Sequence, residues 1–139
     1  MKLNEIMTKE VIIIHPEDTL QAAAKKMRDH DIGFLPVYEE RELVGVLSDR
    51  DIVVRAIAEH RDPDTLITRD LMTSPPVCCF EDQDVEDAAR VMNQNQIRRL
   101  VILNRADHEL MGVVSLGDLA LHVNSNVPAE VLQNVSEPG

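Results

Sequence analysis

Short apolar segments and amphipathic stretches follow one another along the chain in a regular order. Residues 11–14 are a run of branched aliphatic side chains that ends before Pro16, which predicts a buried strand. Apolar residues then recur at i, i+3, i+4 and i+7, the spacing of a helix with one buried face. This stripe consists of Leu20, Ala23, Ala24 and Met27. Asp18 and Gln21 have capping-box spacing, so we expect the helix to start near Asp18–Thr19.

A hairpin and a second helix are predicted to follow. Residues 34–38 and 43–47 are apolar segments separated by the polar turn 39–42, and the next helix is expected to begin at 48–51. Pro36 places the first of these strands at an edge or an end of a sheet. Each half of the chain therefore has the order strand, helix, strand, strand, helix. The matching strands of the second half are expected at 77–80, 100–103 and 110–114.

The second half of the chain repeats the first. With a shift of 65 residues, Met7-Thr8 coincides with Met72-Thr73, and the helical stripe coincides with Val85, Ala88, Ala89 and Met92. With a shift of 67 residues, the segment 45–51 coincides with 112–118. Two copies of one supersecondary unit predict a pseudo-symmetric body, which can have two equivalent clefts where the copies meet, rather than a single catalytic centre.

The length of the chain limits how the two copies can fold. The sequence has 139 residues, and a unit of about 60 residues is marginally stable alone. We therefore expect one domain in which the copies share a core. The expected divisions are residues 1–62, residues 63–126 and a tail at 127–139, with a short helix within 127–135.

Composition excludes several classes of function. The net charge is −11 and aromatic residues are 2% with no Trp, so neither nucleic acid nor an anionic membrane surface is an expected partner. No segment has the length and apolarity of a membrane span, and the first residues lack the apolar core of a signal peptide. We expect a cytoplasmic location.

Cysteine and histidine offer little chemistry. Cys78 and Cys79 are adjacent, and neighbours rarely form a structural disulfide, so two reduced thiols in a strand are expected, with a redox switch as the alternative. The five His residues lack metal-ligand spacing, so no metal site is predicted.

One motif could carry binding chemistry. Gly-x-x-Ser-x-x-Asp occurs at Gly45/Ser48/Asp51 and again at Gly112/Ser115/Asp118, where a strand leads into a helix. Free N–H groups at a helix N-terminus attract phosphate, the Ser hydroxyl can donate to it, and the carboxylate can accept from a ribose diol. The same Ser-x-x-Asp spacing also suits a capping box. Duplication would copy a cap as faithfully as a binding site, so both interpretations stay open.

The order and spacing of these segments resemble the tandem cystathionine-β-synthase-type (CBS) domain pair, or Bateman module. The resemblance covers about residues 3–123 and includes Met7-Thr8, Ile32 to Val37 and Gly45 to Ile52 with their second copies. The segments 48–53 and 62–65 are similar to those of small bacterial proteins that consist of a CBS pair and little else. The resemblance implies an α+β fold with two β-α-β-β-α repeats that pack through their sheets as a pseudo-two-fold pair.

The family resemblance also implies a ligand. CBS pairs commonly bind AMP, ADP, ATP or S-adenosylmethionine, some with magnesium or NAD-type ligands, and two modules often associate. Carried over by position, Asp51 and Asp118 would hold ribose hydroxyls, and Ser48 and Ser115 would lie near phosphate. The residues expected to flank the adenine are Val11, Ile12, Val77 and Cys78. The backbone around Leu35, Pro36 and Leu100 would read the base or line the cleft.

The two copies differ in charge. Arg50 follows Ser48, whereas Gly117 holds that place in the second copy, and Arg98 and Arg99 stand where the first copy has Gly33 and Phe34. Phosphate binding in a protein of net charge −11 needs local positive charge, so Arg50 and Arg99 are candidate phosphate ligands. A surface ion pair, for example between Arg50 and Asp49, is the competing role. The two clefts are expected to differ in affinity.

Two functions follow from the sequence. The first is a regulatory module that senses an adenosine-containing ligand and acts through a homodimer or a separately encoded target protein. The second is a ligand-free dimerisation or protein-interaction module in which the Ser-x-x-Asp pairs only cap helices. An enzyme is not expected, because the chain has no nucleophile elbow, no Walker-type phosphate loop and no metal-ligand cluster.

Overall fold

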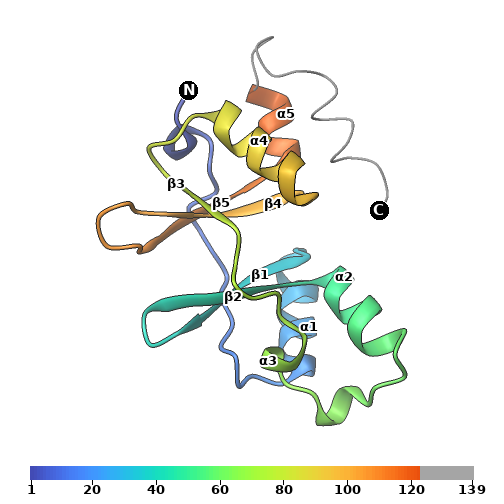
Figure 1. Ribbon diagram of the computed structural model, residues 1–139. Coiled ribbons are helices and arrows are strands. Elements are labelled where there is room, and N and C mark those ends of the chain that lie inside the picture. The colour runs from blue at the N-terminus through green and yellow to red at the C-terminus, as the bar shows by residue number, and fades with distance from the viewer. Residues whose placement is uncertain (123–139) are drawn as a thin grey trace. The chain divides into compact units, whose positions relative to one another are not determined.

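The protein consists of two compact units, and its structure is a computed structural model that describes residues 1–122 (Figure 1). One unit, here called the central unit, is the continuous segment Ile12–Pro76. The other, the terminal unit, combines Met1–Val11 with the chain from Val77 onward. The sequence repeats and the compact units therefore do not coincide, because the first eleven residues pack with the second half of the chain. The helix expected within 127–135 lies outside the described residues.

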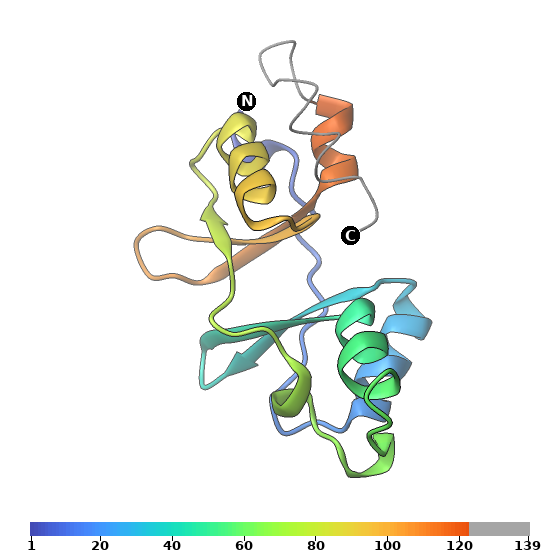
Figure 2. The ribbon, with the colours of Figure 1, turned by 45° about the vertical axis from the view of Figure 1, so that its right-hand side comes forward.

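The central unit places its helices on one side of a two-stranded antiparallel sheet (Figures 1 and 2). Helix α1 (Leu20–His30) precedes the hairpin, which is formed by strands β1 (Phe34–Glu39) and β2 (Glu42–Ser48). The chain continues through α2 (Asp49–Ile52), the π-helical turn η2 (Val53–Ile57), the 3₁₀ turn η3 (Pro63–Thr65) and the short helix α3 (Thr68–Leu71). The hairpin and both predicted helices are confirmed.

The terminal unit repeats this plan with a third strand. The 3₁₀ turn η1 (Leu3–Glu5) comes first, and β3 (Cys78–Phe80) then leads to helix α4 (Val85–Asn95). The hairpin consists of β4 (Arg99–Leu103) and β5 (Leu110–Ser115), and α5 (Leu116–His122) follows. The strand order is β3-β4-β5, with β3 parallel to β4 and β4 antiparallel to β5. Mixed helices and small sheets give the α+β class that the sequence predicts.

The predicted strand at 11–14 is wrong except for one bridge. Ile14 pairs with Val37, donating its N–H to the Pro36 carbonyl at 3.0 Å and accepting from Tyr38 N at 2.9 Å. In a parallel ladder the next bond would need an N–H at Pro36, and proline has none. Val101 stands at the matching place in the second copy, and pairing there extends over Cys78–Phe80. One proline therefore shortens the first copy's sheet.

Helix α1 starts where the sequence predicts, but its capping residue differs from the expected one. Thr19, not Asp18, is the N-cap, and its hydroxyl accepts a hydrogen bond from Ala22 N at 3.1 Å. The Asp18 carboxylate instead accepts from His15 N at 3.0 Å, one turn before the helix. Threonine and aspartate are both good caps, so sequence spacing alone could not choose between them. The stripe is buried as predicted except at Ala24, which is exposed.

Each unit buries an apolar core of its own, contrary to the expectation of a shared one. The central core is built around α1 and the β1–β2 hairpin, and the terminal core around α4 and the β4–β5 hairpin. Leu3 is fully buried in the terminal core, which explains why residues 1–11 belong to that unit. The fully buried residues of the cores include Ile14, Leu35, Leu47 and Leu71 in the central unit and Leu3, Met92, Leu100 and Leu119 in the terminal unit.

The Met-Thr pair at the start of each sequence repeat packs against the hairpin of the other repeat. Thr73 exchanges backbone hydrogen bonds with Val46 at 2.8 and 3.0 Å, and Thr8 does the same with Val113 at 2.9 and 3.0 Å. A Cβ atom at Gly45 would lie 2.8 Å from the Thr73 carbonyl oxygen. At Gly112 it would lie 2.8 Å from the Thr8 carbonyl oxygen. Both glycines are therefore required by the close approach of backbone.

Cys79 belongs to the terminal core. It is 2% exposed and packs among apolar side chains of the unit, and both cysteines are free thiols. Burial raises the pKa of Cys79 to about 11, with smaller contributions from Cys78 and Asp87. Because only the thiolate is a good nucleophile, this residue is an inert core side chain at neutral pH.

Alanine at Gly45 or Gly112 should destabilise the protein. The added methyl group must displace backbone rather than a flexible side chain, so a loss of about 1–3 kcal/mol in the free energy of unfolding is expected. Gly117→Ala is the matched control, because its nearest neighbour would be Ser115 Oγ at 3.6 Å. That change should be neutral or stabilising by up to about 1 kcal/mol. Denaturant unfolding of the three variants measures this, and equal effects at all three positions would contradict it.

Stability should fall at alkaline pH through Cys79. The folded-state pKa of about 11 lies above the ordinary value of 9.0, so above pH 9 the unfolded chain loses this proton while the folded protein keeps it. The contribution of the thiol is complete below pH 9 and is lost between pH 9 and about pH 11. Denaturant unfolding at pH 8 and at pH 10.5 should show a smaller alkaline loss in Cys79→Ala than in the parent protein. Equal losses would show that Cys79 does not titrate in this way.

Candidate functional site

In the central unit, Ser48 and Asp51 of the first Gly-x-x-Ser-x-x-Asp motif form a capping box at the junction of β2 and α2. Ser48 N donates to Asp51 Oδ2 at 2.9 Å, and Asp51 N donates to Ser48 Oγ at 3.1 Å. Ser48 ends the strand and serves as the N-cap of α2. The Asp51 side chain is only 15% exposed. The capping arrangement that the sequence left open is therefore formed.

The terminal unit reproduces this geometry almost exactly in the second motif. Ser115 N donates to Asp118 Oδ2 at 2.9 Å, and Asp118 N donates to Ser115 Oγ at 3.0 Å. Both residues are half-buried, at the junction of β5 and α5. The two copies have thus kept the same pair of bonds.

The cap does not exhaust the hydrogen-bonding capacity of these side chains. In each motif the aspartate uses Oδ2 to accept a backbone N–H, and the serine hydroxyl acts as an acceptor. Asp Oδ1 and the Ser O–H proton take no part in the cap, and a carboxylate can accept several hydrogen bonds. The capped pair can therefore still accept one hydroxyl donor and donate to one anion.

Positive charge is distributed differently around the two motifs. In the central unit the guanidinium of Arg55 approaches Asp51, with Nε 3.8 Å from Oδ1. Arg50 is exposed, and only its backbone N–H bonds to Asp49, at 2.8 Å from Oδ1. The ion pair proposed for Arg50 and Asp49 is not formed. Asp49 instead packs over Gly33, where a Cβ atom would lie 2.5 Å from its Oδ2.

In the terminal unit, the cation nearest the motif in the sheet is Arg99, which aligns with Phe34 of the first repeat. It is half-buried on β4, directly opposite Ser115 of β5 in the antiparallel register. Its neighbour Arg98 accepts a hydrogen bond from Leu116 N at 2.7 Å through its carbonyl group, as Gly33 does from Asp49 N at 2.9 Å. The terminal motif therefore has two arginines on the neighbouring strand end, where the central motif has Gly33 and Phe34.

The apolar candidates fall into two groups. Leu35, Leu100 and Pro36 are buried, and both leucines are fully enclosed in the cores, so only their backbone could meet a ligand, as the family resemblance implies. Val11, Ile12, Val77 and Cys78 are half-buried, which leaves part of each side chain accessible. Burial raises the pKa of the Cys78 thiol, so Cys78 would offer an uncharged, apolar surface.

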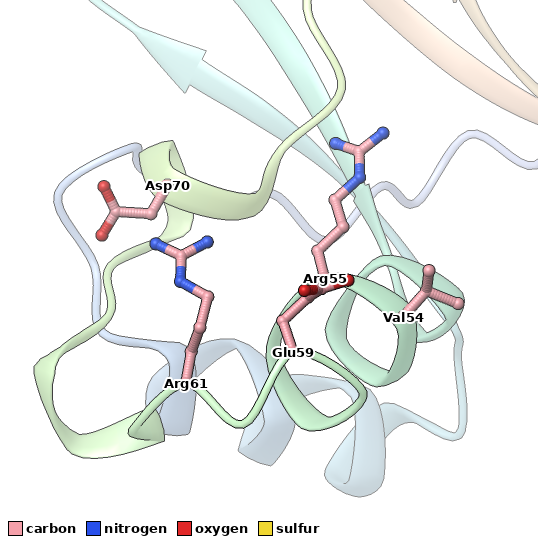
Figure 3. A pocket seen from close by; sticks show the side chains of 5 residues that line it. All are labelled: Val54, Arg55, Glu59, Arg61 and Asp70. Carbon is pink, nitrogen blue, oxygen red and sulfur yellow. The ribbon is translucent and has the colours of Figure 1, made fainter.

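Arg55 is a residue near the site that sequence reasoning missed. Besides approaching Asp51, it donates from Nη1 to the Leu71 and Met72 carbonyls, at 2.9 and 3.2 Å. Arg55 also borders an open depression of about 480 Å³, together with Val54, Glu59, Arg61 and Asp70 (Figure 3). Its spacing of four residues from Asp51 on a helix is the only sequence signal that could have drawn attention to it.

Within residues 1–122, no group of three or more His, Cys, Asp or Glu side chains could hold a metal ion. In the same residues, no helix has the length and apolarity needed to cross a bilayer.

Comparisons with known proteins agree with the fold and the repeat. The CBS domain family matches residues 3–57 and again 68–125. The CBS domain-containing protein YhcV of Bacillus subtilis is 39% identical over 135 residues, which are 96% of this chain and 94% of that protein.

Two solved structures are also similar. The crystal structure of Hypoxic Response Protein I with two coordinated zinc ions has a TM-score of 0.78 and 33% identity, over 89% of this chain and all of that one. CBSX2 in complex with AMP has a TM-score of 0.73 and 25% identity, over 86% of this chain and 93% of that one. The CBS family model matches both repeats, and each unit contains the same backbone pairing of a Met-Thr segment with a hairpin strand. The chain therefore belongs to the CBS domain family, as a tandem pair of CBS repeats.

Proposed function

We propose that the protein is a regulatory module that binds an adenosine-containing ligand at its Gly-x-x-Ser-x-x-Asp motifs. The main support for the proposal is that Oδ1 of each aspartate accepts no hydrogen bond within the capping box. Asp51 and Asp118 are held in one rotamer by the cap, and their second oxygen remains available to ribose hydroxyls. A preorganised acceptor loses little entropy on binding. The AMP complex of CBSX2, a protein of the same fold and 25% identity, supports an adenosyl ligand.

The remaining candidates complete each proposed site. Ser48 and Ser115 would donate to phosphate, assisted by Arg50 in the central unit and by Arg99 in the terminal unit. Val11, Ile12, Val77 and Cys78 would contact the adenine, and the backbone at Leu35, Pro36 and Leu100 would face the base. Magnesium would enter only with a polyphosphate ligand such as ADP or ATP. We propose a regulatory role rather than an enzymatic one, because these residues offer hydrogen bonds and charge but no activated nucleophile.

The proposed sites should differ in the charge that they prefer. Arg99 brings a cation to β4 directly opposite Ser115, whereas Asp49 adds a negative charge over Gly33 beside Ser48. A ligand phosphate is attracted by the first arrangement more than by the second. We therefore expect the terminal motif to bind AMP, ADP or ATP more tightly. The central motif is the better candidate for a ligand of lower negative charge, such as S-adenosylmethionine.

A ligand-free interaction module is the second candidate, and two observations favour it. Both motifs form complete capping boxes, so a structural role alone would explain their residues. Exposed apolar side chains also occur at matching positions after them, with Val54 44% and Leu121 81% exposed. We propose that η2, which contains Val54, and α5, which contains Leu121, contact a second copy of the chain in a homodimer. A separately encoded target would then read the dimer in the cytoplasm.

Ligand binding can be separated from capping by substitution with asparagine. Asp51→Asn and Asp118→Asn each keep one carbonyl oxygen for the serine N–H, so the caps and the fold should survive with losses below about 1 kcal/mol. Each variant lacks the second anionic oxygen that ribose needs. A thermal-shift panel of AMP, ADP, ATP, NAD, NADH and S-adenosylmethionine, with and without magnesium, should show stabilisation of the parent protein. At 100 times the dissociation constant the gain is about 2.7 kcal/mol.

The double variant should show no shift with the same ligand. Ser48→Ala with Ser115→Ala serves as the comparison, because it removes the caps and should lower the starting stability by about 1–2 kcal/mol. No shift of the parent protein at millimolar ligand, or an undiminished shift in the double asparagine variant, would reject the proposed function and favour the interaction module.

The homodimer can be tested by placing charge on the exposed helices. Val54→Glu with Leu121→Glu should shift the protein toward monomer in sedimentation equilibrium, because a carboxylate is costly to bury in an apolar interface. Gln21→Glu, at an exposed position of α1, is the control and should leave the association unchanged. A parent protein that is monomeric at tens of micromolar would contradict this arrangement.

A further inference from the structure

Arg55 connects the carboxylate of Asp51 to a backbone segment distant in sequence. Its Nη1 group donates to the Leu71 carbonyl at 2.9 Å and to the Met72 carbonyl at 3.2 Å. Its Nε atom lies 3.8 Å from Asp51 Oδ1, the oxygen that the capping box leaves over. The side chain extends from the helix toward the chain that follows α3 (Figure 3). One guanidinium therefore contacts three acceptors in two different parts of the central unit, namely two carbonyls at the end of α3 and the Asp51 carboxylate of α2.

The segment that Arg55 binds has a structural task of its own. Leu71 is the last residue of α3, and Thr73 pairs with Val46 of β2 through two backbone hydrogen bonds. Met72 lies between them and packs on Gly45, the glycine of the first motif. Carbonyls at a helix C-terminus need donors from outside the helix, and Arg55 supplies them. The attachment of residues 71–73 to the hairpin is thus held partly by a side chain that also faces Asp51.

The terminal unit has the same backbone pairing and the same cap, but no arginine at the matching position. Thr8 pairs with Val113 just as Thr73 pairs with Val46, and Asp118 has the same cap as Asp51. His122 occupies the position of Arg55 in the repeat, four residues after Asp118. In the part of the chain from 1 to 122, Asp118 forms no ion pair comparable with that of Asp51. The two motifs therefore differ in charge and also in the side-chain link that Arg55 makes between the capped aspartate and the Met-Thr segment.

We propose that Arg55 is a positioning residue that couples the state of the Asp51 carboxylate to the pairing of Thr73 with Val46, and that the terminal unit lacks this coupling. The inference rests on the proposed function only where it assigns a ligand to Asp51. A long side chain held at one end loses less entropy when its other end is bound. The attraction of Asp51 therefore supports the bonds to Leu71 and Met72. A ligand hydroxyl that donates to Asp51 Oδ1 weakens this attraction and loosens residues 71–73.

The coupling can be tested first without ligand, by amide hydrogen exchange on the full chain. Asp51→Asn removes the charge that faces Arg55 and should speed exchange of the Thr73 amide by about two- to fivefold, the range of a partly exposed ion pair. In an Arg55→Met background the same substitution should have no further effect. Asp118→Asn is the internal control and should leave exchange of the Thr8 amide unchanged. Additive effects of Asp51→Asn and Arg55→Met, or equal responses of Thr8 and Thr73, would overturn the inference.

The second arm adds AMP at a concentration that saturates both motifs, including the central motif, which is expected to bind AMP more weakly than the terminal one. Exchange at Thr73 should rise relative to Thr8 in the parent protein, and the rise should be absent in Arg55→Met, although that variant still binds AMP. Should Arg55→Met fail to fold, Arg55→Lys keeps a cation but loses the forked donor geometry, and it should show the same loss of response. AMP binding with an unchanged Thr73-to-Thr8 ratio, or with equal changes in both proteins, would overturn the coupling while the proposed function stood. Failure of AMP to bind, with the ligand-free cycle intact, would reject AMP as the ligand and support the Arg55 connection.

Discussion

The backbone pairing of a Met-Thr segment with a glycine-containing strand is the contact on which the architecture depends. It occurs twice, as Thr73 with Val46 and as Thr8 with Val113. In both places the segment belongs to the beginning of one sequence repeat and the strand to the other repeat. The contact requires a residue without a side chain, because a Cβ atom at Gly45 or Gly112 would lie 2.8 Å from a carbonyl oxygen. It is therefore sensitive to a single methyl group.

This backbone pairing also lies close to the polar residues of the candidate site. The strand that accepts the Met-Thr segment is the strand whose end forms the Ser-x-x-Asp cap. Backbone attachment and capped carboxylate are thus only a few residues apart in each unit. A side chain such as Arg55 can reach both. The same few bonds consequently stabilise the fold and determine which donors and acceptors are left for a ligand.

Much of the fold could be predicted from the sequence, and the failures have physical reasons. The repeat, the hairpins and the helices after each motif were predictable, because periodicity and turn composition report local structure. The assignment of residues 1–11 to the second half was not predictable, because a repeat does not reveal which copy its first segment packs against. The strand at 11–14 failed because Pro36, a residue on the partner strand, lacks the N–H that the ladder needs. The capping residue of α1 was predicted wrongly because aspartate, present at position 18, caps helices as well as the threonine at position 19 that does so.

The candidate site shows the same division. Ser48, Asp51, Ser115 and Asp118 were identifiable from spacing, and the structure gives both pairs the same bonds. Arg55 was not identifiable, because its importance comes from two carbonyls sixteen and seventeen residues away in sequence. Contacts between a side chain and distant backbone leave no pattern in the residue types, and they are found only once the fold is known.

The discontinuous composition of the terminal unit has a consequence for the order in which the protein is made. The central unit is one unbroken stretch, Ile12–Pro76, so all of its contacts are present once that stretch has left the ribosome. Residues 1–11 emerge before the central unit, yet the strands and helix that they pack against come after residue 76. Leu3 and Met7 must therefore wait, exposed to solvent, until the second half of the chain has been synthesised. Domains that fold during synthesis generally do so in chain order, whereas here residues 1–11 precede the central unit and complete their contacts after it.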